Sequence, residues 1–439
     1  MLMSSQSDAD STRSQPAITS PLLKMWALFL GVLLMMLGNG LQGTLVGVRS
    51  TNEDFATGVI GVILAAYYAG FLLGSRFTIR ALGKVGHVRV FAALASLAST
   101  AFLIHSILVN PPTWLLMRFV TGFCMAGLYV VTESWLNDQT TPETRGRTLS
   151  LYMVVTMGGV TGGQFLLNVA DPNSFELFII ASVLVSMSLV PMALSEASAP
   201  AIPQQATLPF RDLLRIVPTG VVTMFFSGAA AGSLFAFGPV YASRIGMNNA
   251  QISLFLSAAL VGSLVFQLPI GALSDKISRR AVMAGCALIA TVASIVGLGT
   301  GTGFGATAAL FAIGATSFPL YSLAIAYTND WIEDHQRVGA AGLLVMINGV
   351  GAILGPLFAA LLMSLFEPSA YFWSLIITHG AIFLYFLVRI VIRDALPVDE
   401  QSTYRPYPAR SSAIATSIGH RIPKPKVPKP ARGRRHPDD

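Results

Sequence analysis

Charged residues are scarce in this chain: Asp, Glu, Lys and Arg together make up 11% of its 439 residues. A soluble domain carries about 25% of such residues, so most of this chain cannot face water. The chain is correspondingly apolar, with 53% hydrophobic residues and a mean hydropathy of +0.65. The composition therefore indicates a protein that lies largely within a lipid bilayer.

Several chemical signatures are also missing. The chain has two cysteines, Cys124 and Cys286, which both fall in apolar segments and form neither a disulfide framework nor a metal-binding pattern. There is no glycine-rich loop of the kind that binds nucleotide phosphates, and no pair of carboxylates placed for acid–base catalysis. We therefore expect neither an ATP-driven pump nor an enzyme, and we expect no cofactor and no metal.

The second half of the chain repeats the first at an offset of 192 residues. Tyr129 is matched in this way by Tyr321, and Arg145 by Arg337. The same offset, without any insertion, relates Gly70 to Gly262, Lys84 to Lys276, Gly122 to Gly314 and Asp138 to Asp330. A unit of this length is a duplicated half-protein rather than one turn of a solenoid. Paired halves of this kind are typical of membrane proteins whose binding site lies at the repeat interface.

Each half contains about six apolar segments long enough to cross a bilayer, by the criterion of roughly 20 residues. We expect an all-α membrane protein with about twelve transmembrane helices in two six-helix repeats. The predicted regions are a disordered N-terminus at 1–21, a bundle at 22–195, a linker at 196–215, a second bundle at 216–393 and a disordered basic tail at 394–439. The predicted spans are 22–48, 57–79, 88–109, 113–136, 148–168, 174–195, 216–242, 251–273, 281–300, 304–328, 338–364 and 371–393.

The basic residues predict the orientation. All but three of the 28 Lys and Arg fall on one side of the predicted spans; the exceptions are Arg49, Arg244 and Arg118. Since basic residues collect on the cytoplasmic side, we expect a multi-pass protein of the plasma membrane (a bacterial inner membrane) with both termini in the cytoplasm. The same rule explains the net charge of +7 without a nucleic-acid partner. The basic tail is either a solvated consequence of this rule or a contact for anionic lipid headgroups.

The loop after the eighth span carries the most specific motif. Its sequence, Gly271-Ala-Leu-Ser-Asp275-Lys276-Ile-Ser278-Arg279-Arg280, resembles the signature loop of the major facilitator superfamily, with Ser278 where the family usually has Gly. The resemblance implies that these charges pair across the interface between the halves and close the cytoplasmic side; alternatively, they only set the topology.

The equivalent loop of the first half keeps the cations Lys84 and Arg89. However, it has Gly83 where the second half has Asp275. We therefore expect the two copies of the loop to differ in the contacts they make.

The fourth span carries Arg118-Phe-Val-Thr-Gly122, which resembles another signature of the same family, and then Glu133. Arg118 and Glu133 are separated by about 22 Å along a helix, so they cannot pair directly. For Arg118 we expect a role in a substrate cavity, the alternative being a structural pair, with an acceptor among Gln164, Asn168, water or the substrate. For Glu133 we favour a cytoplasmic gate pair with Arg145.

Other polar residues inside predicted spans are candidates for the same cavity. Asn39 and Gln42 lie about one turn apart and share a face of the first span. We add Gln164, Tyr321 and Asn348, each of which can instead make an interhelical hydrogen bond or pack as core. Tyr67 and Tyr68 of the second span are further aromatic candidates.

The pattern as a whole resembles the YcaD-like branch of the superfamily, through Gly74-Ser-Arg76, Val85-Gly-His-Val-Arg89 and Glu133-Ser-Trp135-Leu-Asn137. The resemblance implies a monomeric secondary transporter for a small molecule, driven by protons, in which the two halves rock about a central site. The scarcity of acids beside Arg118 favours an anionic or neutral substrate. The alternative is a membrane sensor or scaffold that reuses the fold without transporting.

The topology can be tested with reporter fusions. A reporter joined after Arg49 should lie outside the cytoplasm, and one joined after Lys84 should lie inside it. Only the second position lies among clustered basic residues, which mark the cytoplasmic side. Activity of alkaline phosphatase and of a fluorescent protein at each site would measure this. Both fusions reporting the same compartment would contradict the predicted topology.

Overall fold

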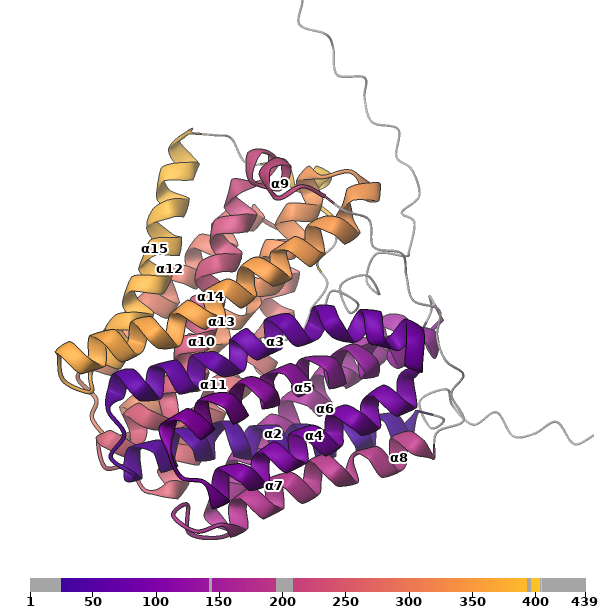
Figure 1. Ribbon diagram of the computed structural model, residues 1–439. Helices are drawn as coiled ribbons and strands as arrows, with labels where there is room; N and C mark the ends of the chain where they lie inside the picture. The colour runs from indigo at the N-terminus through magenta and orange to yellow at the C-terminus, as the bar shows by residue number, and fades with distance from the viewer. Residues whose placement is uncertain (1–24, 142–143, 195–207, 393–395, 403, 405–439) are drawn as a thin grey trace, which may run out of the picture.

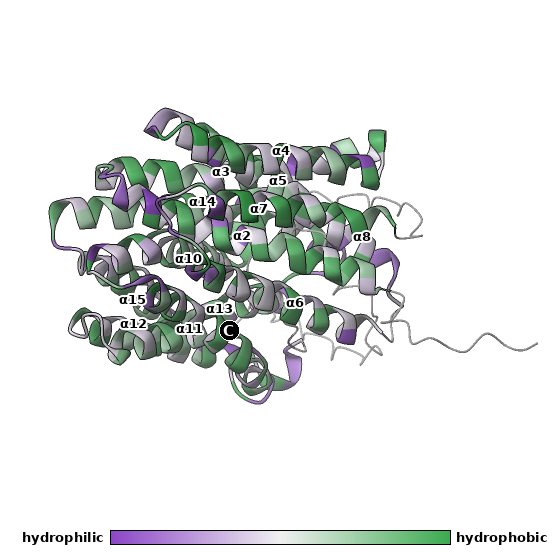
Figure 2. Cartoon of the chain, turned by 90° about the horizontal axis from the view of Figure 1, so that it is seen from below, coloured by the Kyte–Doolittle hydropathy of each residue, from purple (hydrophilic) through white to green (hydrophobic). Residues whose placement is uncertain are grey.

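The computed structural model describes residues 25–141, 144–194, 208–392, 396–402 and 404. This part of the chain is built from helices (Figure 1). Twelve helical segments in it are long and apolar enough to cross a membrane, which confirms the predicted fold class. Figure 2 shows hydrophobic residues along the middle of the helices and hydrophilic residues gathered at helix ends and loops.

The helices fall into two halves. The first half contains α2 (Trp26–Asn52), α3 (Thr57–Val85), α4 (His87–Ile107), α5 (Pro111–Asp138), α6 (Arg145–Phe165) with η1 (Leu166–Asn168), α7 (Glu176–Met187) and α8 (Leu189–Ala193). The second half contains α10 (Pro218–Arg244), α11 (Asn249–Ser274), α12 (Arg279–Leu298), α13 (Phe304–Trp331), η2 (Asp334–Gln336), α14 (Arg337–Leu365) and α15 (Ala370–Ile392). Between them lies α9 (Phe210–Ile216), and η3 (Val398–Glu400) follows α15.

The sequence repeat is a repeat of structure. Helix α2 (Trp26–Asn52) coincides with α10 (Pro218–Arg244) at both ends when shifted by 192 residues. The first residues of α3, α4 and α6 coincide in the same way with those of α11, α12 and α14. The two halves therefore share the order of their helices and the positions at which most of them begin, although some lengths differ: α6 has 21 residues and α14 has 29.

Glycines set how closely the helices pack. A Cβ added at Gly122 of α5 would clash with the backbone of Tyr67 in α3, and one added at Gly314 of α13 would clash with the backbone of Ala259 in α11. These two contacts are equivalent under the repeat. Lipid gives helices no hydrophobic reason to associate, so close backbone packing at small residues becomes the main source of attraction. Both halves are thus held by the same kind of crossing.

The halves meet at one end of the molecule and diverge at the other. We call the end that carries α9 and the loops 275–278 and 332–336 the linker side, and the opposite end the far side. Near the far side, Gly47 of α2 contacts Pro239 of α10, and Gly61 of α3 contacts Ala360 of α14. Figure 1 shows the axes of α3 and α14 close together at this end and spreading toward the linker side. The contact between α3 and α14 continues along both helices, through Leu72 with Gly349 to Arg76 with Met346, before the axes separate.

Prolines distinguish the two halves. Pro239, Pro269, Pro319 and Pro356 lie inside α10, α11, α13 and α14 of the second half. In the first half Pro111 begins α5, and Pro191 follows the break between α7 and α8. An interior proline removes a helical hydrogen bond and bends the helix. The helices of the second half therefore contain bending points that their described counterparts lack.

The glycine crossing can be tested by substitution. Gly122→Ala should lower the stability of the folded protein by about 1–3 kcal/mol, because the added methyl group pushes α3 and α5 apart. Gly158→Ala in α6 is the matched control, since no atom lies within 4 Å of a Cβ added there. Thermal unfolding in detergent would measure both. Equal melting temperatures for the two variants would contradict the proposed crossing.

Candidate functional site

The described structure surrounds the buried cation of α5 with polar and aromatic groups from α2 and α3. A guanidinium nitrogen of Arg118 donates a hydrogen bond to Oε1 of Gln42. The guanidinium carbon also lies 4.5 Å from the centre of the Tyr67 ring. The hydroxyl of Tyr67 donates to Oδ1 of Asn39 over 3.1 Å. We call Asn39, Gln42, Tyr67 and Arg118 the central cluster.

Local sequence explains how Arg118 reaches this position. Helix α5 starts at Pro111, which suits the first helical position, and the Asn110 side chain accepts from the Thr113 backbone over 3.0 Å. Arg118 lies four residues before Gly122, so both project from one face of α5. Gly122 brings the Tyr67 backbone against this face, and Arg118 therefore lies over the Tyr67 ring one turn away.

The central cluster lies between the middle and the far side of α2, α3 and α5. Asn39, Gly43 and Gly47 are spaced four apart and share one face of α2. Because Gly47 contacts Pro239 of α10, this face is directed at the second half. Nothing lies within 4 Å of a Cβ added at Gly43, so the face is less crowded on the side toward Asn39. All four side chains of the cluster are nevertheless at most 5% exposed.

Two of the acceptors that the sequence suggested for Arg118, Gln164 and Asn168, make other contacts, while water and substrate stay predictions. Gln164 and Asn168 lie near the far end of α6 and contact α11 of the other half. Gln164 Oε1 accepts from Ser257 over 3.2 Å, its carbonyl accepts from Ser253 over 2.8 Å, and Asn168 donates to Ser253 over 3.0 Å. These bonds join α6 to α11 on the far side. They are interhelical hydrogen bonds, the alternative role that the sequence offered for Gln164.

The remaining cavity candidates lie in the second half. The Asn348 amide in α14 donates to the carbonyl of Met224 in α10 over 3.1 Å and is half-buried. Tyr321 in α13 is buried in the core of the second half. Neither contacts the central cluster through a bond that the described structure shows, so their assignment to a substrate site stays a prediction.

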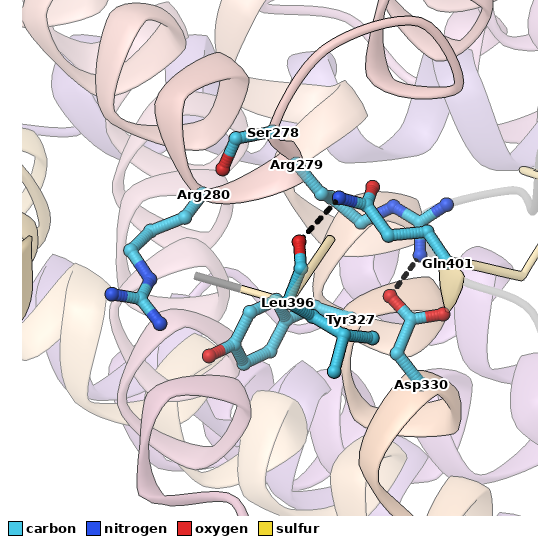
Figure 3. A pocket seen from close by; sticks show the side chains of 7 residues that line it. All are labelled: Ser278, Arg279, Arg280, Tyr327, Asp330, Leu396 and Gln401. Atoms are coloured by element: carbon cyan, nitrogen blue, oxygen red, sulfur yellow. Dashed lines mark hydrogen bonds and ion pairs between the residues drawn. The ribbon is translucent and has the colours of Figure 1, made fainter. Parts of the chain in front are cut away.

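The charged loop of the second half forms a compact network on the linker side. Arg279 is 1% exposed and makes an ion pair with Asp330 at the end of α13. It also lies 3.4 Å from Asp275. Arg280 donates to the carbonyl of Arg389 over 3.1 Å, near the carbonyl end of α15, where a cation is favoured. Figure 3 shows Arg279 directed at Asp330, with Arg280 turned away from them.

This network differs from the expected pairing across the halves. The partners named above all belong to the second half: they are Asp330, Asp275 and Arg389. This agrees with the divergence of the two halves on this side of the molecule. The partner Asp330 was missed by the sequence analysis, although its match to Asp138 in the repeat was visible. A segment after α15 also contributes: the backbone and hydroxyl of Ser402 donate to Asp330 over 2.7 and 2.6 Å. The predicted disordered tail at 394–439 is thus wrong for its first described residues, 396–402 and 404.

The other gate candidates take no part in this network in the described structure. Lys84, Arg89 and Lys276 are exposed at helix ends or in the loop. Glu133 is fully buried in the first half, where its carboxylate accepts from the hydroxyl of Tyr152 over 3.2 Å. The Arg145 side chain lies outside the described residues, so the proposed pair with Glu133 stays a prediction.

The departure from the family signature at Ser278 has a backbone explanation. Its counterpart in the first half, Gly86, has a φ of 90°, which only glycine adopts at low cost. Ser278 has a φ of −52°, which any residue can adopt. The second loop therefore does not need glycine here, and the two loops enter their following helices differently.

Chemically, the central cluster suits an anion. A guanidinium presents several donors in one plane and can hold a carboxylate or phosphate by two parallel bonds. Within the described residues no group of three or more His, Cys, Asp or Glu is placed to hold a metal ion.

The buried pair on the linker side gives a stability test. Asp330→Asn should destabilise the protein by about 3–5 kcal/mol, because it removes the buried counterion of Arg279 and leaves only the partly exposed Asp275 beside it. Asp275→Asn is the matched control and should cost about 0–1 kcal/mol, since the Asp275 side chain is 32% exposed. Chemical unfolding in detergent would measure the free energy of unfolding of both variants. An equal loss of stability would contradict the expectation that Asp330 contributes more than Asp275.

Comparisons with known proteins agree with this architecture. The family model described as the Major Facilitator Superfamily matches residues 28–250 and 220–435. The MFS-type transporter YcaD of Escherichia coli O45:K1 (strain S88) is 28% identical over 370 residues, which cover 84% of this chain and 96% of YcaD.

Solved structures show the same fold. A mutant of the nucleoside transporter NupG superposes with a TM-score of 0.67 at 16% identity, covering 83% of this chain and 99% of NupG. A bacterial homologue of the human lysosomal transporter Spinster, in an inward-facing and unoccupied conformation, superposes with a TM-score of 0.64 at 15% identity, covering 84% and 95% of the two chains. The family match spans both halves of the repeat, and this chain belongs to the Major Facilitator Superfamily.

Proposed function

We propose that the protein is a secondary active transporter that carries a small organic anion across the plasma membrane by alternating access, coupled to protons. The linker side is cytoplasmic in this proposal, so the structure is the inward-facing state. The observation that carries the proposal is the position of Arg118: a buried cation deep in a span of the first half, in a molecule whose two halves contact on the far side and whose helix axes spread toward the linker side.

The contacts between the halves support alternating access. On the far side Gly47 contacts Pro239, Gly61 contacts Ala360 and Gln164 bonds Ser257. Between α3 and α14 the contact continues through Leu72 with Gly349 to Arg76 with Met346. In the proposal these contacts are exchanged for others while each half stays folded. Rocking of one bundle against the other about a central site is the transport mode typical of such duplicated folds.

Arg118 supports an anionic substrate. In the described structure Gln42 and the Tyr67 ring, which are neutral groups, are among the partners of Arg118. A charge deep in a span costs at least about 2.5 kcal/mol on insertion scales. A carboxylate or phosphate that replaced the Gln42 contact would form a stronger, charge-assisted bond with the guanidinium. Binding would therefore be favoured over the unliganded arrangement.

Proton coupling enters the proposal because the sequence carries no phosphate-binding loop of the kind that an ATP-driven pump needs. No residue of the described structure is assigned to the coupling. The rival function is a sensor or scaffold that binds a ligand without moving it, since the fold does not settle function. Net uptake into sealed vesicles separates the two.

The experiment uses the purified full chain. A set of small carboxylates and organic phosphates is first tested for an increase in melting temperature, because a ligand that binds the folded state stabilises it. Compounds that raise it are then tested for uptake into proteoliposomes with an imposed inward or outward proton gradient. Uptake that follows the gradient supports the proposal, whereas binding without uptake supports the sensor.

Arg118 variants test the site. Arg118→Ala and Arg118→Lys should both weaken binding by about tenfold or more, because Lys keeps the charge but loses the planar donors that hold an anion and the stacking on Tyr67. Arg49→Ala is the matched control: Arg49 pairs with Glu53 over 2.6 Å at the far end of α2, away from the cluster. Wild-type binding and transport by a correctly inserted Arg118→Ala protein would contradict the assignment.

A further inference from the structure

The segment that follows the last transmembrane helix docks onto the charged loop of the second half. The backbone N–H of Tyr404 donates to Oδ1 of Asp275 over 2.8 Å. The backbone N–H and the hydroxyl of Ser402 donate to Oδ1 of Asp330, and the Ser402 carbonyl accepts from Arg279. Two residues of the segment thus bond all three members of the ion-pair network.

Tyr404 anchors the segment by insertion. Its ring packs directly on Gly271 of α11, in the place that a side chain at this position would fill. The residue is 8% exposed and joins the hydrophobic core of the second half. Burial raises the pKa of the Tyr404 phenol above its ordinary value, so the ring enters as a neutral group. The phenol end lies beside Gln267 and Ser322.

The rest of the segment stays on the surface. Asp399 and Glu400 of η3 are exposed. Leu396 and Gln401 line a small pocket together with Arg279 and Asp330 (Figure 3), and the Gln401 amide bonds the Leu396 carbonyl within the segment. The docked contact therefore consists of one inserted ring and a few hydrogen bonds, which suits a contact that forms and breaks.

The repeat shows that the docking place is particular to the second half. Under the 192-residue offset, Gly271 corresponds to Ile79, Asp275 to Gly83 and Arg279 to His87. In the first half Ile79 packs against the core, and His87 instead hydrogen-bonds Ser134 over 3.0 Å. Three of the four positions that receive the segment thus differ between the copies, whereas the fourth, Asp330, is matched by Asp138.

We propose that residues 396–402 and Tyr404 form a reversible strap that regulates the transport cycle by docking onto the loop between α11 and α12 while the linker side is open. The proposal rests on the alternating access proposed above. While docked, Ser402 and Tyr404 occupy carboxylate oxygens of Asp330 and Asp275, and Tyr404 holds the end of α11 to the segment. Closure of the linker side requires this loop to approach the first half, so undocking of the strap permits closure.

Two variants release the strap from opposite sides of the contact. Tyr404→Ala removes the inserted ring, and Gly271→Ala places a methyl group where the ring lies, at a position where the first half already carries Ile79. Each should weaken docking about tenfold or more, since an aromatic side chain is expelled from a buried site. Glu400→Ala, at an exposed residue of the same segment, is the matched control.

Docking is read directly in the full chain by hydrogen exchange of the peptide that spans residues 396–404. The amides of Ser402 and Tyr404 should be protected in the wild type and in Glu400→Ala, and should lose protection in both release variants. Conformation is read separately by labelling a cysteine introduced as Gly43→Cys with a membrane-impermeant maleimide from each side. The native Cys124 and Cys286 are buried at 0% and 4% exposure and serve as the background.

The two readouts must be linked in both directions, because coupling between two equilibria is reciprocal. Release of the strap should lower labelling from the linker side about two- to tenfold and raise it from the far side. Conversely, Gly61→Phe, which wedges α3 away from Ala360 on the far side, should both reverse the labelling and deprotect the strap. Gly58→Phe is the control wedge, since nothing lies within 4 Å of a Cβ there.

The outcomes separate the strap from the transport proposal. If the release variants deprotect the segment but leave labelling unchanged, while Gly61→Phe does reverse labelling, the strap is only a surface contact and this proposal is overturned. If Gly61→Phe reverses labelling with the segment still protected, it is overturned as well. If no variant changes labelling from either side, alternating access itself fails, and the regulatory role of the strap fails with it.

Discussion

Close contact between helix backbones is the constraint on which the rest of this structure depends. Lipid supplies no hydrophobic force between helices, so they associate where small residues allow backbones to touch. Gly122 on Tyr67 and Gly314 on Ala259 fix the same crossing in both halves. In the first half this crossing also places Arg118, one turn from Gly122, over the Tyr67 ring. The Arg-x-x-x-Gly spacing is therefore a structural unit: the glycine positions the helix pair, and the pair positions the cation.

The two copies of the repeat agree in packing and differ in chemistry. Helix order and glycine crossings coincide under the offset, because the helices of both copies pack against one another in the same lipid environment. The differences gather at the polar positions. Arg118 is matched by Leu310, which is buried in core, and Gly83 is matched by Asp275. The first half thus carries the buried cation of the central cluster, and the second half carries the carboxylates that hold the strap.

The sequence predicted the spans, the halves and most of the central cluster, because hydropathy, repeat offset and helical spacing are local properties. Helical spacing also placed Asn39 and Gln42 on one face. What it could not predict is which helices are neighbours: Gln42 rather than Gln164 accepts from Arg118, because α2 and not α6 lies beside that part of α5. The strap was missed for a related reason. Proline and lysine in the tail predict that it forms no core of its own, but say nothing about Tyr404 filling a gap in another core.

The distribution of prolines has a mechanical consequence. A helix without an interior proline resists bending over its whole length, whereas a missing hydrogen bond concentrates bending at one point. Pro239, Pro269, Pro319 and Pro356 give four helices of the second half such points. If a load is applied equally to both bundles, the second deforms and the first turns as a stiff body. After duplication, the copies have therefore diverged in elasticity, and motion in this molecule is unequally shared between two halves that look alike.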